Sequence, residues 1–248
     1  MSGRNLAIIV VALRPRSGVT LLARAFADYF ILSHENPLIF DTDDVERRLS
    51  RHFPQRANVV DLDRIRGQMT LFDTLAAPVA EKRVVDVTHR ALNRFFGLMA
   101  EIDYLAEARL QGIEPAIFYI ADRDRESFEL GLDLRDRFDC PFVLVENAYL
   151  GEPNTQARRT QAYAALVGHP LRMRMPPLDS LVADVISRTD LSFGAFMRDE
   201  VRNLSLAYLS RPTIRAWIMQ VFREIHRTIQ ALSAMPLAPR AAVATRAG

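Results

Sequence analysis

Seven short runs rich in β-branched and aromatic residues recur along the chain, and each is followed by a longer stretch with helical spacing. Some of these runs, such as AIIVV and AIFYIA, are apolar at every position and therefore need cover on both faces. A mostly parallel sheet between two layers of helices provides that cover. We therefore expect an α/β fold, a doubly wound sheet of about seven strands with helices on both faces. The predicted strands are residues 6–13, 38–41, 57–60, 83–87, 116–121, 142–146 and 171–175.

The stretches between these runs carry apolar residues three and four positions apart, and the last quarter of the chain is helical in pattern throughout. We expect an α/β domain over 1–190, a helical segment over 191–234 packed on that domain or on a partner, and a flexible tail over 235–248. The predicted helices are residues 19–33, 43–53, 67–81, 90–111, 124–138, 155–167, 178–188, 193–209 and 212–233.

Charge and cysteine content exclude several classes of protein. The net charge of +2 is too small to require a nucleic acid or a membrane through bulk electrostatics. Cys140 is the only cysteine, so an internal disulfide and a cysteine metal cluster are both excluded, and the five histidines have no zinc-like spacing. No stretch reaches the roughly 18–20 apolar residues that cross a bilayer. We expect a cytoplasmic location.

The segment after the first predicted strand has the arrangement of a phosphate-binding loop. In a strand–loop–helix of this kind, backbone N–H groups and the helix N-terminus cradle phosphates. Gly18 and Thr20 occupy the positions of the last loop glycine and of the Mg²⁺-binding hydroxyl, whereas Val19 occupies the position of the loop lysine. The residues expected to surround a bound nucleotide here are Arg14, Arg16, Ser17, Gly18, Val19, Thr20 and Leu21.

This loop and the helix sequence LLARAFADYF resemble the deviant Walker A motif of the ParA/MinD family, K-G-G-x-G-K-T, and the helix that follows it. Aligned on Gly18 and Thr20, Arg14 falls on the additional lysine of the family and Val19 on its phosphate lysine. Because most loop positions depart from the pattern, the resemblance is carried by an ordered set of segments over about residues 6–190.

The further segments follow in the order that the family has. NPLIFDTDDVERRL resembles the second strand and first switch, with Asp43 at the aspartate that positions water. RVVDVTHRA resembles the Walker B segment, with Asp86 at the aspartate that supports Mg²⁺. PFVLVENAYLG is similar to the strand that ends in the base-contacting asparagine, here Asn147, and RMRMPPLDS resembles the next strand and loop, which adds Pro176 to the expected nucleotide site.

The resemblance implies a site for ATP and Mg²⁺, with Thr20 and Asp86 at the metal and Asp43 as the catalytic residue. It also implies a homodimer in which Arg14 replaces the lysine that reaches across to the partner subunit, and a protein cargo or adaptor as a further partner. The stretch VVDVTHRALNRFFGLMAEIDYLAEARLQGI is similar to the plasmid-associated branch of the family, whose members assist plasmid stability, including partitioning, or conjugal transfer.

The residues themselves argue against efficient hydrolysis. A loop lysine neutralises charge on the transferred phosphates, and the apolar Val19 does not. Lys82 is the only lysine, and it precedes the fourth predicted strand, at the opposite end of the sheet from the loop. Arg14 and Arg16 are either phosphate ligands, because guanidinium groups bind phosphate oxygens bidentately, or solvated loop residues.

Several candidate residues have structural interpretations as well. Aspartates at strand ends form turns and caps, as we expect for Asp41 and Asp44, and Asn147 is a candidate turn residue. Three hypotheses therefore stay open. The chain is a nucleotide-binding positioning factor with weak or no hydrolysis, a slow Mg²⁺-dependent ATPase that uses the loop arginines, or a pseudo-NTPase that dimerises without nucleotide.

The last predicted helix, 212–233, has an apolar face that a neighbour must cover. Packing on its own domain or on a second subunit is the ordinary interpretation, and contact with a membrane surface is the alternative. Arginine-rich patches at 47–51, 158–159 and 172–174 would suit non-specific DNA binding, although acidic residues lie near each and a solvated face is the ordinary interpretation.

Overall fold

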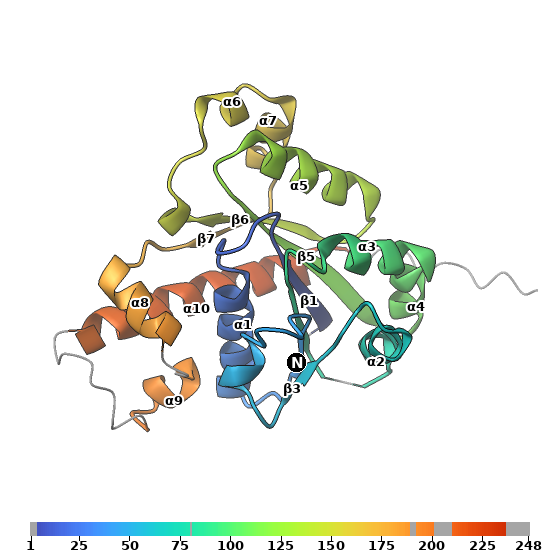
Figure 1. Cartoon of the computed structure of the whole chain (residues 1–248), viewed down its shortest axis with the longest axis horizontal. Helices are drawn as coiled ribbons and strands as arrows, with labels where there is room; N and C mark the ends of the chain where they lie inside the picture. Colours follow the sequence, from blue (N-terminus) through green and yellow to red (C-terminus); the bar gives the residue numbers. More distant parts are fainter. Residues whose placement is uncertain (1–3, 80, 189–191, 201–209, 237–248) are drawn as a thin grey trace, which may run out of the picture.

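The computed structural model describes residues 4–79, 81–188, 192–200 and 210–236. Its centre is an all-parallel, seven-stranded sheet in the order β3-β2-β4-β1-β5-β6-β7 (Figure 1). This confirms the predicted fold class, and each predicted strand overlaps an observed one. The strands are β1 (Asn5–Val11), β2 (Leu38–Asp41), β3 (Ala57–Val59), β4 (Arg83–Val87), β5 (Ile113–Ala121), β6 (Phe142–Asn147) and β7 (Arg172–Met175).

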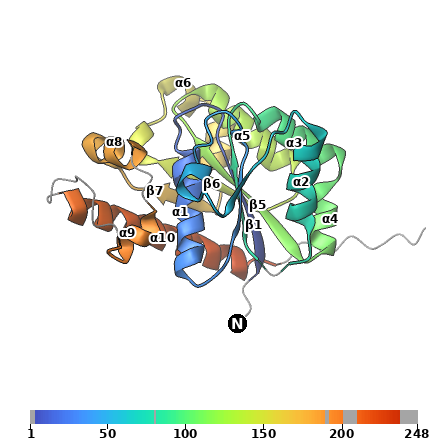
Figure 2. The same cartoon turned by 60° about the horizontal axis from the view of Figure 1, so that its bottom comes forward.

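Helices cover both faces of the sheet, as Figure 2 shows. α1, α8, α9 and α10 contribute to the core on one face, and α2, α3, α4, α5 and α7 to the core on the other. The helices are α1 (Val19–Leu32), α2 (Ile65–Ala76), α3 (Leu92–Glu101), α4 (Tyr104–Leu110), α5 (Arg125–Arg137), α6 (Thr155–Arg158), α7 (Gln161–Val167), α8 (Ser180–Arg188), α9 (Phe193–Met197) and α10 (Ser210–Ala234), with 3₁₀ turns η1 (Ser50–His52) and η2 (Ala148–Leu150).

The central strand β1 explains why its sequence shows no alternation. Leu6, Ile8 and Val10 belong to one hydrophobic core, and Ala7 and Ile9 belong to the other, all of them at most 1% exposed. Side chains of a strand alternate between faces, so a strand buried on both sides is apolar throughout. Parallel pairing with β4 and β5 brings the carboxyl ends of these strands to one edge, where ligands bind in such sheets.

The predicted helix 43–53 is wrong. The segment is a series of turns that ends in η1. The carboxylate of Asp41 accepts hydrogen bonds from the backbone N–H groups of Asp43 (3.0 Å) and Ser50 (2.8 Å), and Arg47 has a positive φ of 53°. Short acidic side chains that bond to backbone N–H groups compete with helix formation, and here they fix a loop instead.

Two other predicted helices are each divided into two. The helix expected over 90–111 breaks at Asp103, whose φ of 50° is left-handed, and becomes α3 and α4. The helix expected over 155–167 breaks where the side chain of Thr160 caps α7 by accepting from the Tyr163 N–H. The helix expected over 67–81 is α2, which ends at Ala76 because the following residue precedes Pro78 and is extended.

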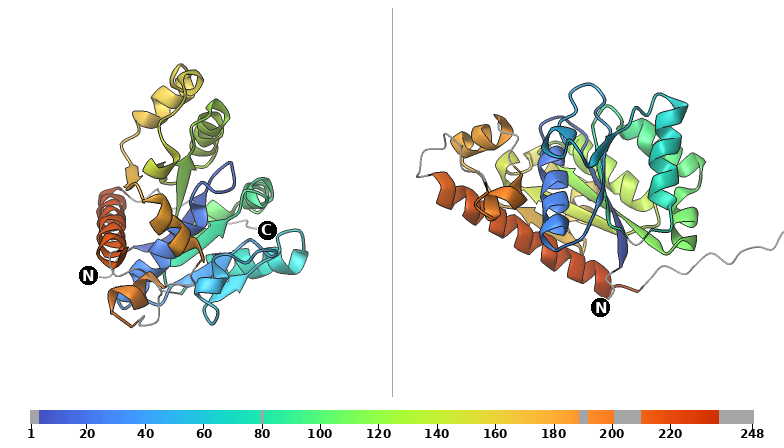
Figure 3. Two further views of the ribbon diagram at one scale, coloured as in Figure 1. Left: turned by 60° about the vertical axis from the view of Figure 1, so that its left-hand side comes forward. Right: turned by 90° about the horizontal axis from the view of Figure 1, so that it is seen from below.

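The C-terminal helix α10 lies against α1 and β7 and completes the core on that face (Figure 3). Its buried stripe consists of Ile214, Trp217, Ile218, Val221, Ile225 and Leu232. Within the described residues, no helix is long and apolar enough to span a bilayer. The predicted helix 193–209 is α9 at its start, and its residues 201–209, like most of the predicted tail, lie outside the described residues. The proposed division at residue 190 stays a prediction.

Candidate functional site

The loop between β1 and α1 has a backbone that wraps around the start of the helix. Arg16 and Gly18 both have positive φ values, 62° and 101°, and the Gly18 carbonyl accepts the first helical bond from Leu22 N–H at 2.9 Å. The Ser17 side chain is buried, and its Oγ donates to the Arg14 carbonyl at 2.9 Å. A tight turn that opens directly into a helix leaves backbone N–H groups directed outward, as an anion cradle requires.

Asn147 at the end of β6 holds this loop from one side. Its Nδ2 donates to the Ser17 carbonyl at 2.9 Å, and its Oδ1 accepts from Tyr149 N–H at 3.1 Å. A Cβ on Gly18 would lie 2.8 Å from the same Nδ2, so the close approach and the positive φ both require glycine. The structure therefore brings Asn147 and the loop together, as the sequence predicts, with the amide in contact with the loop backbone. Its contact with a base stays a prediction.

Three further candidates, Val19, Leu21 and Pro176, have contacts with the protein interior. Val19, at the lysine position, is 9% exposed and belongs to the hydrophobic core, and Leu21 is half-buried against the same core. Pro176 follows β7, and its carbonyl accepts a hydrogen bond from Trp217 Nε1 at 3.1 Å. The backbone oxygen of Pro176 is thus used to attach α10 to the sheet.

The acidic candidates gather on the other side of the loop, at the carboxyl ends of β2 and β4. Asp41, Asp43 and Asp86 are all buried, and the Thr20 side chain lies close enough to Asp86 to lower the pKa of its carboxyl. Burial, followed by the negative charge of Asp41, raises the pKa of Asp86 to about 7. Burial also raises the pKa of Asp41. The structure thus joins three predicted residues, Thr20, Asp43 and Asp86, around one acidic centre.

Asp43 has partners within its own loop. Its Oδ1 accepts from the Glu46 N–H at 2.9 Å, and Oδ2 lies 3.8 Å from Arg48 Nε. Arg48 and Arg90 both form ion pairs with Glu46, at 2.6 and 3.2 Å, which connects the segment after β2 to the segment after β4. The two regions that resemble the family's switches are therefore in direct contact.

Sequence reasoning missed Thr42, which joins the ends of these two strands. Its Oγ1 donates to the Asp86 carbonyl at 3.0 Å and accepts from Thr88 N–H at 2.9 Å. A threonine between two aspartates at a strand end was the available signal, because a hydroxyl group both donates and accepts.

The two loop arginines have different surroundings. Arg14 forms ion pairs with a group of acidic residues that sequence reasoning also missed, here called the acidic cluster: Asp122, Asp124 and Glu126. Arg16 is exposed, and among the described residues no hydrogen bond or ion pair engages it. Lys82 donates to the Arg4 carbonyl and lies 3.7 Å from Glu35, at the amino end of the sheet, so it is remote from the loop as expected.

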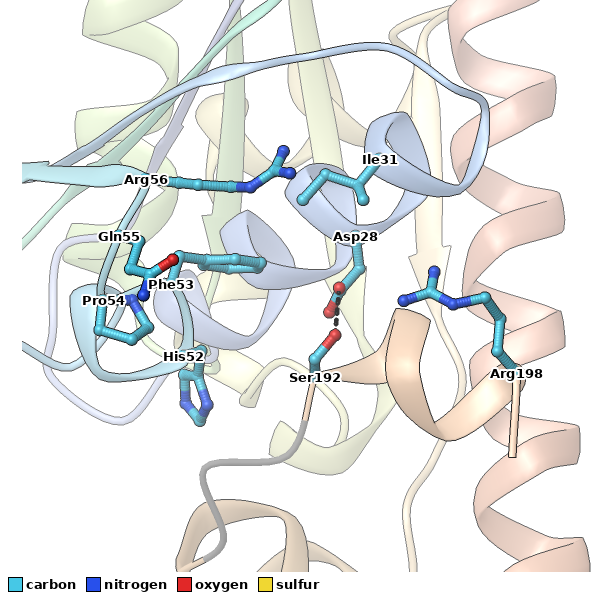
Figure 4. A pocket seen from close by; sticks show the side chains of 9 residues that line it. All are labelled: Asp28, Ile31, His52, Phe53, Pro54, Gln55, Arg56, Ser192 and Arg198. Carbon is cyan, nitrogen blue, oxygen red and sulfur yellow. Dashed lines mark hydrogen bonds between the residues drawn. The ribbon is translucent and has the colours of Figure 1, made fainter. Parts of the chain in front are cut away.

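A cavity of about 250 Å³ lies at the other end of α1, away from the loop. Figure 4 shows Asp28 and Ser192 facing each other in it, with Arg56 and Arg198 on its two sides. His52 also lines this cavity, and burial together with the charge of Arg24 lowers its pKa to about 3. The cavity is lined by both acidic and basic side chains, Asp28 on the one hand and Arg56 and Arg198 on the other.

The comparisons with known proteins concern the fold alone. No family model and no curated protein matches the chain. A solved structure, the MinC:MinD cell division protein complex of Aquifex aeolicus, contains a chain with 11% sequence identity and a TM-score of 0.51. The alignment covers 94% of this chain and 98% of that chain. The fold is MinD-like. This agrees with the resemblance found in the sequence, at the level of architecture.

Proposed function

We propose that this protein is a nucleotide-binding switch or positioning factor of the ParA/MinD kind that binds nucleotide with Mg²⁺ and hydrolyses it slowly or not at all. The observation that carries the proposal is the loop of residues 14–20, in which the positive φ values of Arg16 and Gly18 turn the backbone tightly into α1, as a phosphate cradle requires, while the lysine position is filled by a core valine. The MinD-like fold supports the nucleotide class.

The oxygen donors at the acidic centre are compatible with Mg²⁺. Thr20 and Asp86 supply a hydroxyl and a carboxylate side by side, and hard oxygen ligands suit this ion. The described residues contain no group of three acidic, histidine or cysteine side chains arranged as a metal site, so the protein by itself offers few ligands. A Mg²⁺ ion held here through water and phosphate would neutralise phosphate charge when bound.

The charges around the loop favour binding of nucleotide together with Mg²⁺ over binding of nucleotide without the ion. Asp41, Asp43 and Asp86 repel phosphate, and no lysine lies in the loop to balance them. Arg14 and Arg16 are both exposed, but among the described residues only Arg14 has acidic partners, and the guanidinium of Arg16 is suited to phosphate oxygens. We therefore assign phosphate contact to Arg16 and to the loop N–H groups, and metal support to Thr20 and Asp86. Asp43 would orient water only after releasing its contacts in its own loop.

Calorimetric titration with ATP, with and without Mg²⁺, tests this assignment. The proposal expects micromolar binding that requires Mg²⁺ and weakens by ~10-fold in Arg16→Gln, since one charge-assisted contact is lost. Arg94→Gln, an exposed arginine on α3, is the matched control and should bind like the parent protein. An absence of binding at millimolar ATP contradicts the proposal.

The pseudo-NTPase hypothesis is the second candidate, and one observation favours it. Arg14, which the resemblance assigns to the partner subunit's nucleotide, is ion-paired within its own chain. A dimer that forms without nucleotide would fit this arrangement. Light scattering coupled to gel filtration, with and without Mg²⁺-ATP, separates the two candidates. A switch should change from monomer mass to dimer mass only when Mg²⁺-ATP is added, whereas a pseudo-NTPase should have the dimer mass in both conditions.

The partners remain part of this proposal. A homodimer and a protein cargo or adaptor follow from the resemblance, as does partitioning of a plasmid. The MinD-like neighbour is a component of a MinC:MinD complex, which supports a protein partner. Non-specific DNA binding and membrane contact by α10 are weaker candidates, because α10 already covers the core and the net charge is only +2.

A further inference from the structure

Arg14 lies within reach of three carboxylates, two from the loop between β5 and α5 and one from the first turn of α5. Its Nε is 3.7 Å from Asp122 Oδ2 and its second guanidinium nitrogen is 3.1 Å from Glu126 Oε2, while the first pairs with Asp124 Oδ2. All three carboxylates follow β5, the neighbour of β1 in the sheet. The side chain of Arg14 therefore points along the sheet edge toward β5, and its charge is already balanced.

The carboxylates of the acidic cluster are held in place by other contacts. Asp122 Oδ1 accepts from the Asp124 N–H at 2.9 Å, which leaves Oδ2 for Arg14. Asp124 Oδ1 accepts from Asn154 Nδ2 at 2.9 Å, which again leaves Oδ2 for Arg14. Each aspartate thus uses one oxygen to fix its own position, while the other faces the guanidinium, through a direct contact for Asp124 and at 3.7 Å, without a hydrogen bond, for Asp122. The positions of both aspartates are therefore fixed by contacts that do not involve Arg14.

The electrostatic balance also keeps Arg14 where it is. Burial raises the pKa of Asp122, and the positive charge of Arg14 opposes that rise. Removing Arg14 would leave the three carboxylates facing one another without a cation. A phosphate that competes for Arg14 must therefore replace three anionic partners at once, whereas Arg16 has no such partner among the described residues.

We propose that Arg14 is a positioning residue: it fixes the phosphate loop to the β5–α5 loop and is withheld from phosphate, in its own subunit and in a partner. Arg14 holds one end of the loop, since its carbonyl also accepts from Ser17 Oγ, and Asn147 holds the Ser17 carbonyl. The loop keeps its shape without a ligand. The part that concerns phosphate rests on the proposed nucleotide site, and the part that concerns loop shape does not.

Amide hydrogen exchange of residues 12–18, measured without ligand, tests the positioning role. Exchange should be ~3–10-fold faster in Arg14→Gln, and similarly faster when the acidic cluster is neutralised by Asp122→Asn, Asp124→Asn and Glu126→Gln together. Because both changes break the same contacts, the variant that combines them should exchange about as fast as either change alone. Arg125→Gln with Glu129→Gln removes an exposed ion pair on α5 (2.6 Å) and is the matched control. Unchanged exchange in Arg14→Gln overturns the positioning role.

Titration of the same variants with Mg²⁺-ATP tests whether Arg14 is withheld. Arg14→Gln should change the affinity by less than about 2-fold, and neutralising the acidic cluster should tighten binding more in the Arg14 protein than in the Arg14→Gln background. Loss of ~10-fold in Arg14→Gln alone would show a phosphate contact and overturn this part. If no variant binds nucleotide while exchange responds as expected, the proposed function fails and the positioning role of Arg14 stands.

Discussion

Asp86 illustrates how one residue can be both costly and useful. It is 3% exposed at the end of β4, close to two other buried aspartates, and these surroundings raise its pKa to about 7. Burying a carboxylate next to like charges destabilises the ionised form. Such an arrangement of carboxylates does not stabilise the fold. Clustered carboxylates of this kind are typical of sites that bind a cation.

The raised pKa of Asp86 predicts a pH-dependent stability. The unfolded chain loses this proton near pH 4, but the folded protein keeps it until about pH 7, so the free energy of unfolding should fall as pH rises between these values. The expected loss is on the order of 3 kcal/mol. Urea unfolding at pH 5 and pH 8 measures it. Asp86→Asn should reduce this dependence, whereas Asp44→Asn, an exposed neighbour, should leave it intact.

Val19 provides a second prediction at the scale of one residue. Val19→Lys restores the lysine of the motif at a position that is 9% exposed. We expect unfolding to become easier by about 1–3 kcal/mol, because a charge enters the core edge, and Mg²⁺-ATP binding to tighten by ~10-fold. Thermal unfolding and calorimetry measure the two effects. Val45→Lys, at a position 67% exposed, is the control and should change neither. A lysine at position 19 that lowers stability without tightening binding would contradict the proposed phosphate site.

At the scale of elements, α1 connects the loop to α9. Asp28 is 1% exposed, and its carboxylate accepts from Ser192 Oγ (2.8 Å) and from the Phe193 N–H (2.7 Å), so it caps the start of α9 from a different helix. Four residues earlier on α1, Arg24 stacks on the Phe193 ring at 3.9 Å and approaches His52 Nε2 at 3.4 Å. The helix that begins at the loop therefore contacts α9 and the turn after β2 with one face.

Removing this cap should release α9. Asp28→Ala deletes two hydrogen bonds to a buried carboxylate and should cost about 2–4 kcal/mol of unfolding free energy. Phe193 packs against Trp217, the only tryptophan, with ring centroids 5.8 Å apart, so tryptophan fluorescence should report the change. Asp133→Ala, exposed on α5, is the control. A stability loss below 1 kcal/mol would show that α9 does not depend on this contact.

At the scale of the whole molecule, α10 decides which surface is available to partners. Its apolar stripe covers the sheet and α1, and Tyr29 on α1 is hydrogen-bonded to His226 at 2.8 Å. This arrangement corresponds to the first of the two interpretations of the stripe, packing on its own domain. Membrane binding through the same face would require α10 to leave the core and expose that stripe to water.

Substitutions in the apolar stripe of α10 should therefore lower the free energy of unfolding of the protein. Ile218→Ala should cost about 2–4 kcal/mol, because a fully buried side chain is lost from the core, whereas Met219→Ala, 46% exposed, should cost less than about 0.5 kcal/mol. Chemical denaturation measures both.

Sedimentation with anionic lipid vesicles should leave the parent protein in the supernatant, and its recovery with the vesicles would contradict the packed role of α10.

The sequence by itself determined the fold class, the strands and the placement of a tight, glycine-containing loop before α1. These features depend on local patterns, since strands buried on both faces are apolar throughout and Gly18 is needed where φ is positive. The family resemblance also assigned Thr20, Asp86 and Asn147 to one nucleotide site, and in the structure these residues lie at the edge where the carboxyl ends of the parallel strands meet.

Only the tertiary structure decided what each side chain contacts. The segment 43–53 has helical spacing, yet the carboxylate of Asp41 captures its backbone N–H groups and makes it a loop. Arg14 has the same local sequence signal as Arg16, but the acidic cluster, over a hundred residues away in the chain, neutralises only Arg14. Periodicity reports which face of an element is buried, whereas the partner of a charged group depends on which strands become neighbours, and that is settled only when the sheet forms.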